Sequence, residues 1–478
     1  MSAALDRYLD ANRDRFVTEL RELCAIPSEA ADPAALRRAA DWCEQRLRAA
    51  GCAAHQVTLD GVPPGERAVP PGERVVPPGE RAVPPGESMV PPLVVGEAGS
   101  GKRTLIGVQH YDVQPAVPLE LWKTPPYEPA VRDGAVFARG VDDNKGHLLL
   151  RIQAVEAYRA VHGELPIRVR FLIEGEEESG SVNLERLLAI EPALTDGDGA
   201  LKEGGAIDSG GRPLLLLGGK GIYYVELRVR TLARDAHSGG ATHLPNAAWR
   251  LVDALKTLMD ERGHVLIEGF YADVRAPTKE ERAHVASLPF DAAETKRIYA
   301  LERFAFGRGD AEVRLASVYE PTCNICGIVG GFIGPGTKTV IPSEASAKID
   351  FRLVPDQDPK RIGQLVRAHL DRQGYKDVET IAKEGEVPYR GRLDDPIVRA
   401  AKAAAEEAFG TEALLVPSSG GTSPMWVVCH KRSLANVTLG MGHPGSGAHA
   451  PNENILLDNY WKALRATVRL YELYATQA

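Results

Sequence analysis

The stretch F-L-I-E-G-E-E-E-S-G-S, from Phe171 to Ser181, places three consecutive carboxylates directly after an apolar run that begins at Ile167. The apolar run predicts a buried strand that ends just before Glu176, Glu177 and Glu178. Like charges crowded at the end of a buried strand repel one another and raise each other's pKa. A fold rarely accepts this unless cations lie among the carboxylates, because a divalent ion inverts the local electrostatics. The stretch therefore predicts a site that holds metal ions.

Strand-like and helix-like patterns alternate around this stretch. Short apolar runs over 105–108 and 169–173 predict buried strands, and a helical pattern over 146–161 separates them. A capped amphipathic helix is predicted from Asp32-Pro33 to Gly51. This alternation predicts an α/β fold, with a mixed sheet flanked by helices.

The pattern changes at Gly219. Residues 223–229 and 348–353 alternate apolar and polar side chains, as half-solvated strands do, and 245–259 has helical spacing. A helical pattern like those found before residue 219 returns over 395–409. The expected division is a catalytic domain over 1–218, completed by 386–478, and an inserted α+β domain over 219–385.

Residues 62–92 repeat V-P-P-G-E-R-A with a period of seven. Proline and glycine exclude a heptad coiled coil despite the period. A Pro-Pro pair in each repeat favours extended polyproline conformation, so we expect a solvent-exposed loop expansion that is dispensable for catalysis. A partner-docking segment is the alternative.

The composition excludes several classes of protein. The chain has 478 residues, 44% hydrophobic and 26% charged, which is typical of a globular protein larger than one ordinary domain. Its net charge of -8 gives no support for nucleic-acid binding, and no apolar run is long enough to span a membrane. The charged N-terminus does not resemble a secretory signal. Six scattered cysteines favour reduced thiols and a cytoplasmic location.

Two motifs add candidate ligands near the predicted strand ends. In Q-H-Y-D-V-Q-P, His110 follows a predicted strand and Asp112 lies two residues on, so both side chains share one side of an extended chain. A metal-binding imidazole commonly has a carboxylate on its second nitrogen. In R-G-V-D-D-N-K-G, Asp143 is a second candidate ligand. A helix N-cap is a sufficient alternative for Asp143.

Two weaker motifs complete the set. Glu203 precedes a flexible Gly-Gly turn, and His449 lies in the glycine-rich stretch 445–453. Together the motifs supply two histidines and at least four acids from separated loops. Two divalent ions about 3.5–4 Å apart need that many ligands with one bridging carboxylate, and an unliganded carboxylate to take a proton from water.

These motifs, in this order, resemble the dinuclear metallopeptidase family of carnosinases, cytosolic nonspecific dipeptidases, aminoacylases, acetylornithine deacetylases and glutamate carboxypeptidases. The resemblance covers nearly the whole chain except the proline-rich repeat. It implies two divalent ions per subunit, with zinc favoured and manganese or cobalt possible. One ion would be bound by His110, Asp143 and Glu203, and the other by Asp143, Glu178 and His449. Glu177 would be the general base and Asp112 would orient His110. Glu176 would bind no metal directly and would either lie behind the ligands or face solvent.

The inserted domain resembles the lid and dimerisation domain of that family. A-R-D-A-H-S-G-G, over 233–240, matches the stretch that places a histidine in a neighbouring subunit's active site, which implies a homodimer in which His237 stabilises the oxyanion. Without the flanking motif, a surface-loop histidine would be the simpler interpretation. The resemblance also implies substrate contacts by Thr339, Arg352, Gly420, Gly421 and Thr422, with Arg352 paired to a carboxylate.

The expected reaction is hydrolysis of the peptide bond of a dipeptide or other small peptide. A water bridging the two metals would lose its proton to Glu177 and attack the carbonyl, and Glu177 would return the proton to the leaving amine. An N-acyl-amino-acid deacylase on the same scaffold is the alternative enzyme. A catalytically silent binding protein is the alternative outside enzymes, and the complete ligand set argues against it. A serine hydrolase lacks the G-x-S-x-G elbow.

Overall fold

The computed structural model describes residues 3–59, 90–429 and 432–477. Most of the proline-rich repeat predicted at 62–92 lies outside these residues. The chain divides into two compact units. The first unit comprises Met1–Gly218, Gly391–Pro417 and Pro424–Ala478, and the second comprises Gly219–Arg390 and Ser418–Ser423.

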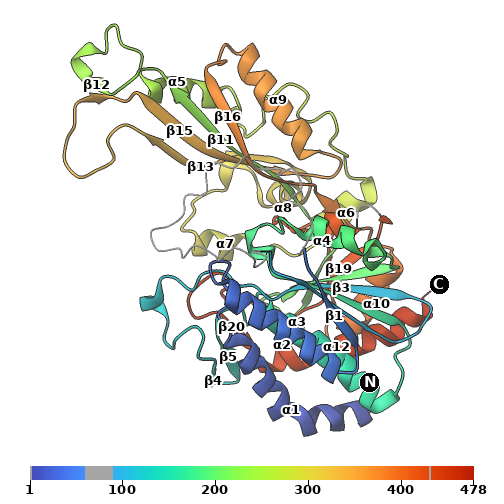
Figure 1. Cartoon of the computed structure of the whole chain (residues 1–478). Helices are drawn as coiled ribbons and strands as arrows, with labels where there is room; N and C mark the ends of the chain where they lie inside the picture. The colour runs from blue at the N-terminus through green and yellow to red at the C-terminus, as the bar shows by residue number, and fades with distance from the viewer. Residues whose placement is uncertain (1–2, 60–89, 430–431, 478) are drawn as a thin grey trace. The chain divides into compact units, whose positions relative to one another are not determined.

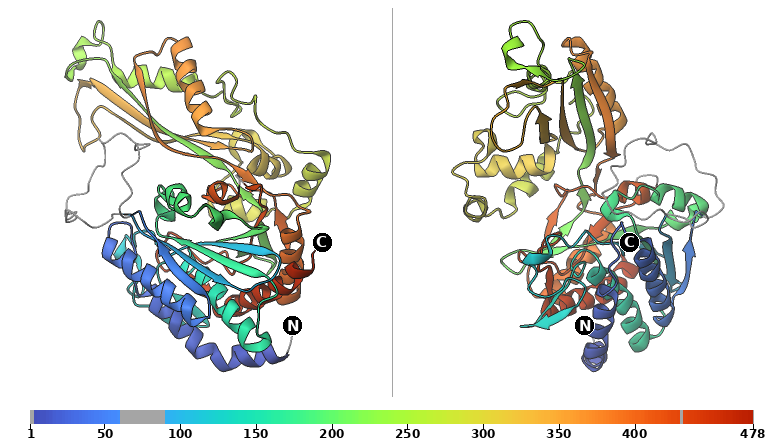
Figure 2. Two further views of the ribbon diagram at one scale, coloured as in Figure 1. Left: turned by 45° about the vertical axis from the view of Figure 1, so that its right-hand side comes forward. Right: turned by 60° about the vertical axis from the view of Figure 1, so that its left-hand side comes forward.

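The first unit is built on a six-stranded mixed sheet in the order β1-β2-β6-β3-β7-β19. Its strands are β1 (Ala53–Val57), β2 (Leu93–Ala98), β6 (Arg168–Glu174), β3 (Thr104–His110), β7 (Gly199–Lys202) and β19 (Asn436–Thr438). β1, β2 and β6 pair antiparallel, whereas β6, β3, β7 and β19 pair parallel. The left view of Figure 2 shows these strands side by side, with helices running along the sheet.

Parallel strands bring the predicted motifs to one edge of this sheet. β3 ends at His110, which pairs with Glu174 at the end of neighbouring β6. β7 ends at Lys202, so Glu203 follows the third parallel strand. Ligands in open α/β sheets bind outside the carboxyl ends of the strands, and this edge carries the predicted metal ligands.

Helices bury the sheet of the first unit. They are α1 (Ala3–Cys24), α2 (Pro33–Ala49), α3 (Lys145–His162), α4 (Leu184–Ile190), α10 (Pro396–Phe409), α11 (Met425–Cys429) and α12 (Leu457–Thr476). Asp32 caps α2 by accepting the N–H of Ala35, as its sequence predicts. α3 is buried on nearly every side, because it contacts the strand β3 and the helices α1 and α12. Both termini lie on this unit (Figure 1).

Smaller strands of the first unit lie beside the main sheet. β4 (Ala130–Arg132), β5 (Ala135–Phe137) and β20 (Asn454–Leu456) form one three-stranded sheet, and β8 (Ala206–Ile207), β9 (Pro213–Leu216) and β18 (Leu414–Val416) form another. The β20–β5 pair connects the segment after His449 to the segment before Asp143.

The second unit has a four-stranded antiparallel sheet in the order β13-β15-β11-β16. The strands are β13 (Thr322–Gly330), β15 (Glu344–Leu353), β11 (Gly221–Arg230) and β16 (Val378–Glu386). Two helices, α5 (Ala247–Lys256) and α9 (Pro359–Arg372), share one core with alternate residues of β11 and β15 (Figure 1). The remaining helices are α6 (Lys279–Ser287), α7 (Ala292–Ile298) and α8 (Asp310–Tyr319).

The predicted fold class is confirmed. Mixed α/β structure with helices against the sheet forms the first unit, and an α+β unit interrupts it in the sequence. The strands and helices predicted over 105–108, 169–173, 146–161 and 245–259 are present as β3, β6, α3 and α5, each shifted by a few residues at its ends. None of the helices described has the length and apolar character needed to cross a membrane.

Candidate active site

The candidate site lies at the carboxyl edge of β3, β6 and β7. His110 is the last residue of β3 and is fully buried. Its Nδ1 lies 3.1 Å from the backbone oxygen of Asp112 and 3.2 Å from Asp112 Oδ1. Because both neighbours are acceptors, Nδ1 carries a proton and donates it. A neutral His110 therefore presents the lone pair of Nε2 to the site, as a metal-binding imidazole does.

Asp143 lies between the two predicted histidine ligands. Its Oδ1 is 3.1 Å from His110 Nε2, and its Oδ2 is 3.1 Å from His449 Nε2. α3 begins at Lys145 with Asn144 at the N-cap, so the alternative interpretation of Asp143 as a helix cap is wrong. One carboxylate that faces two imidazoles with separate oxygens has the geometry of a bridging ligand.

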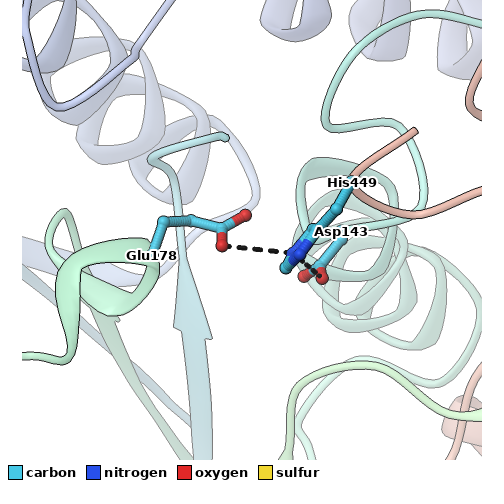
Figure 3. Close-up of side chains that lie close together, drawn as sticks. All are labelled: Asp143, Glu178 and His449. Carbon is cyan, nitrogen blue, oxygen red and sulfur yellow. Dashed lines mark hydrogen bonds and ion pairs between the residues drawn. The ribbon is translucent and has the colours of Figure 1, made fainter. Parts of the chain in front are cut away.

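Glu178 completes one group of ligand atoms. Its Oε2 lies 3.2 Å from His449 Nε2, and the candidate ligand atoms of Asp143, Glu178 and His449 lie within 4.8 Å of one another (Figure 3). Glu178 reaches the site from the 3₁₀ turn η2 (Glu177–Ser179) after β6, whereas His449 comes from the loop before β20. Glu203 belongs to the other group, with Oε2 at 3.9 Å from His110 Nε2.

The electrostatics of these contacts favour added positive charge. Burial lowers the pKa of His110, but its bonds to Asp112 and Asp143 outweigh burial and raise this pKa well above 6.5. The bonds to Asp143 and Glu178 raise the pKa of His449 to about 10. Burial raises the pKa of Asp143, yet the two imidazoles hold it below its usual range. The carboxylates thus attract cations to the space between them.

The residues present fit two divalent cations. Because the proton of a neutral His110 is on Nδ1, its Nε2 is an acceptor, and the contact of this atom with Asp143 Oδ1 requires an added proton or a metal ion. His449 Nε2 faces two carboxylate oxygens, which are acceptors, so this atom too carries a proton or binds a metal ion. Glu178 Oε1 is buried without a hydrogen-bond partner among the described residues, so it has a lone pair to offer. Nitrogen and oxygen ligands suit zinc and manganese.

Glu177 and Glu176 differ in their surroundings. No residue of the described chain donates a hydrogen bond to the Glu177 carboxylate, and burial, followed by the charge of Glu203, raises its pKa well above 4.5. The Glu176 carboxylate accepts bonds from the backbone N–H and the side-chain amide of Asn183. Glu176 is therefore occupied by a local contact, whereas Glu177 is available to accept a proton.

The remaining predicted residues belong to the second unit. His237 Nδ1 accepts the N–H of Gly239 at 3.0 Å, and Thr339 Oγ1 lies 3.4 Å from His237 Nε2. Arg352 Nη1 donates to Thr422 Oγ1 at 2.7 Å, which ties the strand β15 to the loop 418–423. Gly420 and Gly421 lie in the same loop, and a methyl group at Gly420 would meet no heavy atom within 4 Å.

Sequence reasoning missed several side chains that hold the ligands. Gln114 donates to Glu178 Oε2 at 3.0 Å, and Asn144 joins Gln109 to the N–H of Gly204. Glu453 accepts four hydrogen bonds in the segment that precedes α3. Gln114 and Glu453 lie in the same sequence motifs as His110 and His449, and this closeness was the one sign in the sequence that they could matter to the site. Their hydrogen-bond partners lie far away in the sequence, so the contacts themselves could not be predicted.

Comparison with known proteins identifies the class. The model of the peptidase family M20/M25/M40 matches residues 108–473. The chain is 33% identical to human Beta-Ala-His dipeptidase, covering 96% of this chain and 90% of the relative. It is 27% identical to the Cys-Gly metallodipeptidase dug1 of Schizosaccharomyces pombe, over 97% of each chain. A solved M20 family metallo-carboxypeptidase from Sulfolobus solfataricus superposes with a TM-score of 0.85 at 34% identity, covering 96% of this chain and 99% of that one.

The fold and the ligand arrangement define a metal-dependent hydrolase. The chain belongs to peptidase family M20/M25/M40, as the resemblance of its motifs predicted. The predicted class of enzyme, a hydrolase of peptide bonds, is confirmed with it.

Proposed function

We propose that this protein is a dipeptidase that uses two divalent cations to hydrolyse small peptides with a free carboxylate. The observation that carries the proposal is the position of Asp143, whose two oxygens each lie 3.1 Å from a different imidazole Nε2. Glu203 on one side and Glu178 on the other extend this pair into two ligand sets of three residues each.

Bound cations at these positions would supply Lewis acidity, activating a water molecule and stabilising negative charge on the attacked carbonyl oxygen. The chain supplies the proton chemistry. Glu177 takes the proton of the nucleophilic water and delivers it to the leaving amine nitrogen, and its raised pKa suits both transfers. Asp112 keeps His110 in the tautomer that presents Nε2.

The substrate carboxylate is assigned to Arg352 with Thr422, Gly420 and Gly421. A guanidinium matches a carboxylate in charge and shape, and Thr422 holds the Arg352 side chain in place by a 2.7 Å bond. Thr339 is assigned to the same substrate. Names of two relatives, a Beta-Ala-His dipeptidase and a Cys-Gly metallodipeptidase, support a dipeptide as substrate.

His237 is assigned to the oxyanion in a homodimer. Because Nδ1 accepts the N–H of Gly239, a neutral His237 carries its proton on Nε2 and donates from there. The second unit also offers a surface for a second copy. β13 is an edge strand with exposed Ile325, Ile328 and Val329, and Trp249 on α5 is 68% exposed. Unpaired edges and apolar patches of this kind favour association.

The dimer has a direct test. Mixing H237A subunits with E177Q subunits restores part of the activity if His237 acts across the interface, because mixed dimers then hold one complete site. Mixtures that show no more activity than the sum of the separate variants would assign His237 to its own subunit, provided that subunit exchange is verified by mass spectrometry.

Zinc is the proposed native metal and the cytoplasm the proposed location. His and carboxylate ligands accept manganese and cobalt as well, so metal identity needs measurement. The six cysteines are free in the described structure, which suits a reducing compartment.

The decisive experiment is a substrate panel on protein stripped of metal and reloaded with zinc, manganese or cobalt. We expect hydrolysis of dipeptides, little hydrolysis of dipeptide amides that lack the carboxylate, and weaker hydrolysis of N-acetyl amino acids. Preference for N-acyl amino acids would support the deacylase alternative. Preference for longer peptides would support a carboxypeptidase, the activity of the Sulfolobus relative. No hydrolysis with any metal would refute the proposed function.

A further inference from the structure

Glu453 lies in the segment that joins the His449 loop to β20, and its side chain is fully buried. Its carboxylate accepts four hydrogen bonds from one short stretch of chain. Oε2 accepts from Arg139 Nη1 at 2.7 Å and from the Gly140 N–H at 2.8 Å. Oε1 accepts from the N–H groups of Asp142 at 2.9 Å and Asp143 at 3.0 Å. Every partner of this carboxylate is a donor.

The neighbours of Glu453 fix two further loops. Asn452 accepts the N–H of Lys123 at 2.8 Å and donates to the backbone oxygen of Leu121 at 2.9 Å. Asn454 donates to the oxygen of Gly445 at 2.8 Å, inside the loop that carries His449. The segment 452–454 therefore connects the loop of His449 with the stretch that carries Asp143.

We propose that Glu453 is a positioning residue for both cations: it fixes the backbone of Asp143, and thereby the bridging carboxylate, relative to His449. This inference rests on the proposed metal site but not on the identity of the substrate. Glu453 is not within the ligand set, because both of its oxygens are engaged by N–H donors.

The chemistry of the carboxylate explains why a glutamate occupies this position. An acceptor-only group is needed where four donors converge, and an ionised carboxylate is the side chain that offers two such oxygens. The ion pair between Glu453 and Arg139 does not by itself explain the position as a source of stability. The desolvation of a buried ion pair costs about as much free energy as the attraction of its charges returns. Fixing Asp143 in one position is a gain that an apolar pair could not provide.

The variant E453Q tests the proposal with little change in shape. The amide nitrogen of glutamine would face two N–H donors whichever way it turned. Either the backbone N–H groups of Asp142 and Asp143 or the Arg139 guanidinium and the Gly140 N–H would therefore lose their acceptor. Removing a hydrogen-bond partner that orients a metal ligand typically weakens metal binding by about 10–100-fold. We expect that loss when apo protein is titrated with zinc by calorimetry, and an altered absorption spectrum when cobalt is bound.

E156Q is the matched control. Glu156 is also a well-bonded carboxylate of the first unit, accepting from Tyr8, Arg15 and Arg46, but it lies about three turns into α3. We expect E156Q to lower the melting temperature of the apo protein while zinc affinity stays within about twofold. A purely structural role for Glu453 predicts the same result for both variants.

Unchanged zinc affinity in folded E453Q would overturn the proposal, as would an equal loss in E156Q. If E453Q does not fold, E453D is titrated instead, because the shorter side chain keeps the charge but withdraws its oxygens from the amides. The same loss of zinc affinity is expected, and wild-type zinc affinity in E453D would contradict the proposal. If the wild-type protein binds no divalent ion, both the proposed function and this inference are refuted.

Discussion

The Oδ2 atom of Asp112 accepts the backbone N–H of Glu178 at 3.0 Å. Its Oδ1 lies 3.2 Å from His110 Nδ1, so one buried carboxylate contacts a candidate ligand of each ion. The sequence resemblance assigns Asp112 only to His110. The structure shows that Asp112 also holds the turn η2, and therefore the position from which Glu178 reaches His449.

Asp112→Asn should weaken metal binding by about 10–100-fold and lower kcat/KM. An asparagine at 112 has one acceptor oxygen for two donors, the His110 Nδ1–H and the Glu178 N–H. Zinc titration and steady-state kinetics measure the effect. The control is Asp198→Asn, because Asp198 accepts the N–H of Thr104 at the opposite end of β3. Equal losses in the two variants would contradict the assignment.

Glu177→Gln should lower kcat by about 10²–10⁴-fold while both metals stay bound. The amide cannot take a proton from water, whereas no ligand contact is removed. Metal content by mass spectrometry is measured beside kcat. Glu176→Gln is the neighbouring control, and it should retain most activity because the Glu176 carboxylate accepts hydrogen bonds only from Asn183 within the described chain. Near-normal turnover in Glu177→Gln would remove Glu177 from the role of base.

Gly239→Ala should lower kcat while zinc affinity stays unchanged. A Cβ at Gly239 would lie 3.0 Å from His237 Nδ1, so the methyl group displaces the imidazole from the backbone N–H that sets its tautomer. Kinetics together with zinc titration separate this effect from metal loss. Gly309→Ala is the control in the same unit, because its Cβ would meet its nearest atom at 3.8 Å. Wild-type kcat in Gly239→Ala would argue against a catalytic His237.

The buried imidazole of His147 should make the free energy of unfolding depend on pH. Burial, followed by the charge of Arg151, lowers the pKa of His147 from 6.5 to about 4. Its Nε2 accepts the N–H of Met441, so its Nδ1 donates to the Asp142 oxygen and the folded chain keeps this imidazole neutral. Between pH 6.5 and 4 the unfolded chain binds the extra proton, and stability therefore falls as pH falls. The full contribution, present above pH 6.5, is on the order of 3 kcal/mol.

Urea unfolding in EDTA at pH 7 and at pH 4.5 measures this contribution. We expect the free-energy gap between the wild type and His147→Gln to narrow at the lower pH, because glutamine does not titrate. His55→Gln, at an exposed position, is the control. A gap that is constant with pH would show that His147 does not titrate on unfolding as expected.

The sequence was informative where local patterns decide the structure. Apolar runs located β3 and β6, and the order of the motifs identified the candidate ligands that the structure brings together: His110, Asp143, Glu178, Glu203 and His449. Asp143 shows the limit of sequence patterns, because an aspartate before a helix equally suits a cap. The structure instead has Asn144 at the N-cap and Asp143 beside two imidazoles. Glu453 could not be assigned from sequence, because its partners lie more than 300 residues earlier in the chain.

The assignments in the second unit stay predictions. The bond between Arg352 and Thr422 and the contact between His237 and Thr339 are local to that unit, so they show which side chains are held together and not what they bind. Substrate kinetics on variants of Arg352 and His237 are the measurements that bear on their roles.

The late position of His449 in the chain has a consequence for biosynthesis. During translation, His110, Asp143, Glu178 and Glu203 leave the ribosome well before His449, which β20 and the preceding loop deliver to the sheet edge. A chain interrupted before that point would hold all three candidate ligands of one proposed ion and two of the three for the other. If His449 binds the second ion as proposed, incomplete translation products lack a complete pair of ligand sets and would not catalyse the proposed hydrolysis.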